Sequence, residues 1–205
     1  MKQLIIQGRT VDFWHAKQVN PWGCMHHALY AATGEEKVLE HIDDLNTVGR
    51  VALLWQLGYW EITWYTMLCK QRADADVWRA ILERNPKDWL AWIVSIDSLR
   101  FDDTVHTVAV AFNLSGCTDL HGVPFAVVSD SGEDDFVQYA TFDAFVASPY
   151  AAAYDIETLY KMPVPYQPEF VWDVNPSHLK DFDWSSYPPA QAHRPAPSPP
   201  GGESS

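Results

Sequence analysis

The period of the hydrophobic pattern changes about halfway along the chain. In the first half, apolar residues recur at helical spacing, whereas the second half contains short runs of β-branched and aromatic residues. We predict helices over residues 24–34, 35–44, 47–58 and 73–84. Gly34 is placed like a C-cap of the first helix, and Asn85-Pro86 ends the last one.

The strand predictions follow from the same pattern. Residues 2–6 form either a short strand or an apolar tether, and the aromatic segment 13–24, broken by Pro21 and Gly23, is expected to be a loop. Further strands are predicted within residues 61–67, 89–96, 106–113, 122–130 and 154–162, and residues 136–148 mix a short strand with a helix. The expected fold is therefore α+β, with an N-terminal helical half packed on a C-terminal antiparallel sheet.

Composition indicates one globular domain followed by an extension. The chain has 205 residues, of which 47% are hydrophobic, and that is enough for a substantial core. Ten of the 14 prolines lie between Pro163 and Pro200, so we place the domain at 1–162 and the extension at 163–205. The last roughly 18 residues are expected to be extended or disordered. Aromatic residues between 163 and 187 predict packing along the domain or onto a protein partner.

Charge limits the partners. A net charge of −13 with scattered basic residues argues against binding to nucleic acid or to an anionic membrane. No apolar run approaches the roughly 20 residues that a membrane helix needs. The three cysteines have no motif spacing, which favours a reduced environment. We expect a cytoplasmic protein, or part of an intracellularly assembled particle such as a virion, that needs no cofactor.

Cys24 is the strongest candidate for chemistry. It stands where the loop ending in Pro21-Trp22-Gly23 becomes a helix. A helix N-terminus favours the negative thiolate, which is the nucleophilic form of cysteine. The alternative is a small buried apolar residue, and that interpretation is kept for Cys69 and Cys117.

A histidine and an aspartate are expected to lie near each other. His106 begins one predicted strand, and Asp130 ends the next. A hairpin centred near Thr118 places the two opposite each other, within side-chain reach. The alternatives are a polar residue at a strand edge for His106 and a turn residue in Asp-Ser-Gly for Asp130. Gln18, six residues before Cys24, supplies an amide that can donate to an oxyanion beside the thiol.

A metal site is the rival interpretation of the histidines near Cys24. His26 and His27 are adjacent on the predicted helix, so their side chains point about 100° apart and do not easily bind one ion. Sequence motifs such as C-x2-C or H-E-x-x-H are absent. We therefore expect no metal.

The segment from Gln18 to Cys24 resembles the Q-x5-C segment of papain-like cysteine peptidases. The 82-residue spacing from Cys24 to His106, with an aspartate after one further strand, resembles the compact peptidase C39 (bacteriocin-processing) and C39-like families. VGRVALLWQLGYWEI, AWIVSI and TFDAFVAS resemble elements that flank the site in those families. The resemblance covers about residues 15–160. Met25, Thr107 and Ser131 depart from the usual pattern.

This resemblance implies a papain-like fold with Cys24 as nucleophile, His106 as base, Asp130 as orienting residue and Gln18 at the oxyanion hole. The implied activity is hydrolysis of a peptide, isopeptide or related acyl bond in a peptide or protein substrate. A second hypothesis is an inactive papain-like subunit of a larger assembly that docks through its C-terminal tail.

Overall fold

The computed structural model describes residues 1–19, 22–42, 47–66, 71–100, 104–115 and 122–161. These residues belong to one compact unit. The helices are α1 (Cys24–Thr33), α2 (Thr47–Gln56), α3 (Ala75–Arg84) and α4 (Phe142–Val146), with short 3-10 helices η1 (Glu36–His41) and η2 (Pro149–Ala151). The strands are β1 (Lys2–Ile6), β2 (Arg9–His15), β3 (Tyr59–Thr66), β4 (Ala91–Asp97), β5 (Val105–Phe112), β6 (Ala126–Ser129), β7 (Val137–Tyr139) and β8 (Asp155–Lys161).

Six of the strands form one antiparallel sheet in the order β3-β8-β4-β5-β6-β7. The last strand in the sequence, β8, lies between β3 and β4. Strand β3, which comes from the helical first half of the chain, therefore joins the sheet by pairing with β8. Strands β1 and β2 form a separate antiparallel hairpin. The protein therefore has an α+β fold built around a six-stranded antiparallel sheet.

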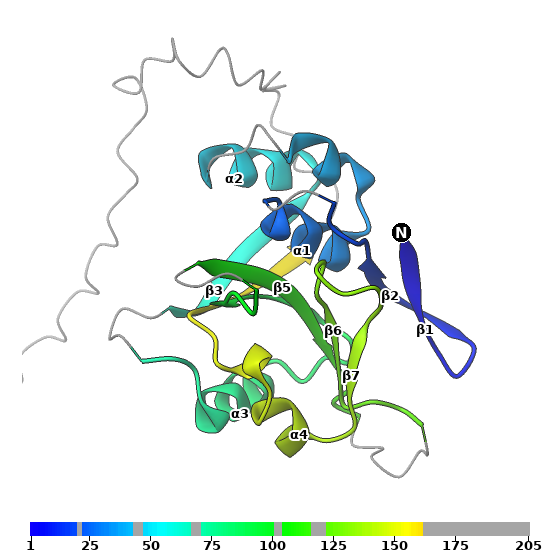
Figure 1. The fold of residues 1–205 in the computed structure, drawn as a ribbon, viewed down its shortest axis with the longest axis vertical. Coiled ribbons are helices and arrows are strands. Elements are labelled where there is room, and N and C mark those ends of the chain that lie inside the picture. Colours follow the sequence, from blue (N-terminus) through cyan, green and yellow to red (C-terminus); the bar gives the residue numbers. More distant parts are fainter. Residues whose placement is uncertain (20–21, 43–46, 67–70, 101–103, 116–121, 162–205) are drawn as a thin grey trace, which may run out of the picture. The chain divides into compact units, whose positions relative to one another are not determined.

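Helices cover both faces of the sheet. Helices α1 and α2 lie on one side and α3 and α4 on the other (Figure 1). Successive side chains of β5 point to opposite faces of the sheet. Val108, Val110 and Phe112 belong to the core under α3 and α4, whereas Ala109 and Ala111 face α1. These five residues and Thr107 are all buried, because both faces of β5 are covered.

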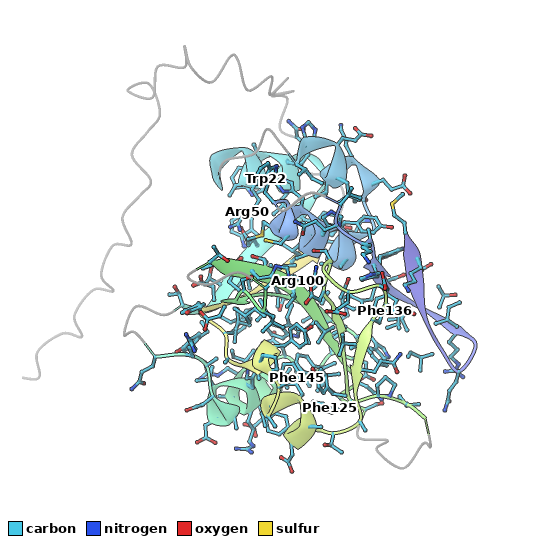
Figure 2. All side chains as sticks on the ribbon, in the orientation of Figure 1. Trp22, Arg50, Arg100, Phe125, Phe136 and Phe145 are labelled. Carbon is cyan, nitrogen blue, oxygen red and sulfur yellow. The ribbon has the colours of Figure 1, made fainter. Side chains whose placement is uncertain are left out.

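The two cores differ in the size of their side chains. Under α3 and α4, Trp78 and Phe145 meet edge to face with their ring centroids 5.2 Å apart, and Phe112 packs against both. Figure 2 shows Phe125 and Phe145 on this side of the sheet. Beneath α1, the small side chains of Ala109 and Ala111 let the helix backbone approach the sheet closely. This close approach brings the first residue of α1 to β5.

Most of the predicted elements are present in the structure. Helix α1 begins at Cys24, and its C-cap is Gly34, in the left-handed conformation. The loop predicted over 13–24 is wrong at its start, because residues 13–15 continue β2, and Trp14 and His15 pair with β1. The division into a helical and a β half was also too simple, since β3 joins the sheet from the first half. The extension from residue 163 onward lies outside the described residues.

We predict that Gly34→Ala destabilises the domain more than Gly58→Ala does. Both glycines have positive φ, 73° and 80° respectively, so alanine is strained at either position. A Cβ at Gly34 would also lie 2.7 Å from the Trp14 ring, whereas a Cβ at Gly58 meets no atom within 4 Å. We expect losses of about 2–4 and about 1–2 kcal/mol respectively, measured by urea unfolding. Equal losses would show that Trp14 does not constrain the end of α1.

Candidate active site

The N-terminus of α1 presents Cys24 at a sharp turn in the backbone. The N-cap, Gly23, has φ 106°, and a Cβ there would lie 2.8 Å from Ile42. Both observations require glycine at this position. In the described structure no side chain caps the helix and no acidic residue lies in its first turn, so the positive end of the helix dipole is directed at the thiol.

The Cys24 thiol interacts with the strand that carries His106. It is hydrogen-bonded to the His106 side chain and to the backbone N–H groups of Thr107 and Met25. Burial by itself would raise the pKa of the thiol, but these hydrogen bonds and the charge of His106 together outweigh burial, and the pKa lies below the ordinary thiol value. The arrangement thus favours the thiolate.

His106 lies between the thiol and a buried carboxylate. Its Nε2 is 2.7 Å from Asp130 Oδ1, which leaves Nδ1 as the ring nitrogen for Cys24. Burial alone would lower the pKa of His106, but the interactions with Asp130 and Cys24 raise it to about 9. At neutral pH the raised pKa of His106 favours the imidazolium, and the lowered pKa of Cys24 favours the thiolate beside it.

Three hydrogen-bond donors hold the side chain of Asp130, a residue that is only 3% exposed. Oδ1 accepts hydrogen bonds from His106 and from the Gly132 backbone N–H at 2.8 Å, and Oδ2 accepts one from the Tyr150 hydroxyl at 2.9 Å. Burial would raise the pKa of this carboxyl, but the three donors lower it below its ordinary value. Burial, followed by the charge of this carboxylate, raises the pKa of Tyr150, so the phenol stays protonated and remains a donor.

Gln18 is fixed to the residue that follows Asp130. The Gln18 backbone N–H donates to the Ser131 carbonyl at 2.7 Å, and the Ser131 hydroxyl donates to Gln18 Oε1 at 2.8 Å. Because Oε1 accepts from Ser131, the amide is oriented with its NH2 group directed away from that serine. Gln18 and Asp130 are thus held by the same turn.

The structure brings His106 and Asp130 together with a different register from the one expected. The β5–β6 ladder pairs Ala109 with Ser129, and continuing it places Asp130 opposite Val108. His106 is therefore diagonal to Asp130 and not directly opposite it as expected. Diagonal neighbours on one face are still within reach of a long side chain. The turn role of Asp130 is also present, because its side chain accepts from the Gly132 backbone N–H.

Sequence reasoning missed two residues of the site. Ser131 was noted only as a departure from a family pattern, and Tyr150 was not considered. The Asp-Ser-Gly turn offered a weak signal for Ser131, but Tyr150 comes from η2, 20 positions after Asp130, and nothing in its local sequence marks it. Cys69 and Cys117 lie outside the described residues.

Two other histidines, His27 of α1 and His15 of β2, have contacts within the fold. His27 Nδ1 lies 2.9 Å from the carbonyl oxygen of Ala16, and His15 Nδ1 lies 3.0 Å from Ser129 Oγ. Burial lowers the pKa of both histidines. Across the described ranges, no three His, Cys, Asp or Glu side chains are grouped so that they could hold a metal ion.

Comparisons of the chain with family models, with curated proteins and with solved structures gave no significant match. None of the helices in the described part of the chain is long and apolar enough to cross a membrane. The interpretation of the site therefore depends on its geometry.

We predict that iodoacetamide modifies Cys24 at a pH where an ordinary thiol is largely protonated. The lowered pKa supplies thiolate in the native protein, and His106→Ala removes the partner that lowers it. In that variant the midpoint of the alkylation rate should rise toward about 8.5, the ordinary thiol value. Asp130→Asn should shift the midpoint in the same direction by a smaller amount, because it removes the carboxylate that raises the pKa of His106.

Site-specific mass spectrometry of the alkylated peptide separates Cys24 from Cys69 and Cys117. Cys24→Ser provides the blank for that peptide. Identical midpoints in the native protein and in His106→Ala would contradict the thiolate–imidazolium pair.

Proposed function

We propose that this chain is a papain-like cysteine hydrolase, similar to the C39-like peptidases, that cleaves a peptide, isopeptide or related acyl bond. The observation that carries the proposal is the hydrogen-bonded series from the buried Asp130 through the partly buried His106 to Cys24. A structural cysteine needs neither a helix N-terminus nor a histidine whose pKa is raised to about 9. Both features are what a nucleophilic thiol requires at neutral pH.

In the proposed acylation step, Cys24 Sγ attacks the carbonyl carbon of the substrate and forms a C–S bond. The π electrons move to the carbonyl oxygen, which accepts hydrogen bonds from the Gln18 amide and the Cys24 backbone N–H. The His106 imidazolium then donates its proton to the leaving amine as the C–N bond breaks. A thioester and a free amine result.

Deacylation reverses the roles. Water attacks the thioester carbon, and neutral His106 accepts the proton of that water. The C–S bond breaks, which releases the carboxylic acid and restores the thiolate–imidazolium pair. Asp130 keeps the ring oriented in both steps and stabilises its protonated form.

We predict that the native chain cleaves members of a mixed peptide library and that Cys24→Ala cleaves none of them. New peptide termini, identified by mass spectrometry after incubation at pH 7, measure the cleavage. His106→Ala should reduce cleavage at least a hundredfold, the scale of lost general acid–base catalysis. Termini that still appear with Cys24→Ala would contradict this mechanism. A chain that neither cleaves nor forms a covalent adduct with a peptidyl electrophile would favour the inactive docking subunit instead.

Gln18 and Ser131 provide a sharper test of the oxyanion hole. Gln18→Ala should lower kcat by about 10²–10³-fold, as loss of an oxyanion donor does. Ser131→Ala keeps the amide but removes the hydroxyl that orients it, so a smaller decrease of about tenfold is expected. Iodoacetamide forms no oxyanion, so the alkylation rate of Cys24 should not change in either variant.

Ser115→Ala, in an exposed loop, is the control for the serine substitution. If Gln18→Ala slowed alkylation as much as turnover, its role would be to shape the thiol site and not to stabilise an oxyanion.

A further inference from the structure

A second group of charged side chains lies under α2 on the same side of the sheet as α1. Arg50 of α2 extends toward the sheet (Figure 2). Its NH2 group is 3.1 Å from Glu61 Oε2, and its NH1 group is 3.8 Å from Glu157 Oε2. These three side chains are only 15–16% exposed. The network thus joins α2, β3 and β8 in a largely buried position.

The sheet register places the two glutamates on one face. Thr63 pairs with Glu157 and Glu61 pairs with Leu159, so Glu61 and Glu157 are diagonal neighbours. Leu159 belongs to the core beneath α1 and α2, and the glutamates therefore face these helices. Asp155, two residues before Glu157 on β8, adds a further negative charge nearby.

One arginine does not balance two ionised glutamates. Burial, followed by the charge of Glu61, raises the pKa of Glu157 to about 7, although Arg50 opposes the shift. Near neutral pH Glu157 therefore changes between a neutral acid that hydrogen-bonds Glu61 and a second carboxylate facing the same arginine. Ile93, beside Glu157 on β4, is apolar.

Arg50 also connects this network to the candidate nucleophile. Its NH1 group donates to Met25 Sδ at 3.4 Å, so NH1 lies between Met25 and Glu157. Met25 is the second residue of α1, and its backbone N–H is one of the donors to the Cys24 sulfur. A contact chain thus runs from Glu157 through Arg50 and Met25 to the thiol.

We propose that Arg50 is a positioning residue for Cys24, acting through Met25. The protonation state of Glu157 sets how strongly Arg50 holds Met25. This inference rests on the proposed role of Cys24 as nucleophile. When Glu157 is neutral, Arg50 pairs with Glu61 and keeps its contact with Met25. When Glu157 is ionised, its charge attracts NH1 more strongly than a thioether does, because sulfur is a weak acceptor.

The direction of the effect follows from these contacts. Below pH 7 Glu157 is protonated, and Met25 is held with its N–H on the Cys24 sulfur. As the pH rises through 7, NH1 moves toward Glu157, and the thiolate loses part of its stabilisation. The reactivity of Cys24 should therefore show an inflection near pH 7, in addition to its own titration, with an amplitude of about two- to fivefold, the scale of one weak hydrogen bond.

The experiment is a pH profile of Cys24 alkylation by iodoacetamide in the full chain, measured from pH 5.5 to 9 by mass spectrometry. The Glu157→Gln variant should show no inflection. Its Cys24 should keep the reactivity expected when Arg50 holds Met25, as in the native protein below pH 7. Met25→Leu preserves the apolar packing but removes the sulfur, and it should also lose the inflection. Glu83→Gln, an exposed position on α3, should leave the profile unchanged. Thermal unfolding of each variant verifies that it is folded.

The outcomes separate this inference from the proposed function. A native profile with the lowered Cys24 midpoint but no inflection overturns the inference and leaves the proposed function standing. An inflection that persists in Met25→Leu but not in Glu157→Gln shows that Glu157 acts on the thiolate through space, which overturns the role of Arg50. A native midpoint at the ordinary thiol value overturns both.

Discussion

The buried carboxylate of Asp130 is the constraint on which the rest of the site depends. A charge with so little exposure is stable only when its lone pairs accept hydrogen bonds, and here a ring, a phenol and a backbone amide supply the donors. The carboxylate in turn keeps His106 protonated, and protonated His106 keeps the Cys24 pKa low. Each group in this series therefore favours the charged form of the next one.

The fold places these groups by giving the two faces of β5 different side chains. The large residues that face α3 and α4 fix the strand in the sheet, and the alanines facing α1 leave space for the helix. Because α1 lies close to β5, the first residue of α1 meets the backbone of Thr107. His106 precedes Thr107 on β5, so the same strand also carries the base to the thiol. Core packing under α1 therefore sets the distance between nucleophile and base.

The hydrophobic pattern and the turn residues of the sequence were sufficient to predict the helix and the strand ends that carry Cys24, His106 and Asp130. Gly34 and the apolar spacing after Cys24 predicted α1, and strand ends marked His106 and Asp130. The predicted register of β5 and β6 was wrong by two residues, because the sequence between the two strands does not define the geometry of the turn that joins them. The insertion of β8 between β3 and β4 was also unpredictable, since strand order is decided by packing of the whole domain. Tyr150 and Arg50 reach the site through such long-range contacts.

The charge of the whole chain makes the local donors at Cys24 more important. A net charge of −13 disfavours a thiolate and favours an imidazolium. Salt screens charges beyond about 8 Å at physiological ionic strength, so most of the acidic surface has a weak effect on the thiol. The groups that decide its pKa are therefore the nearby His106 and the N–H groups of Thr107 and Met25. Among these, only Met25 has a side chain hydrogen-bonded to Arg50, whose neighbour Glu157 titrates near neutral pH. A small change in that contact is thus able to alter the reactivity of Cys24 while the Asp130–His106 pair stays intact.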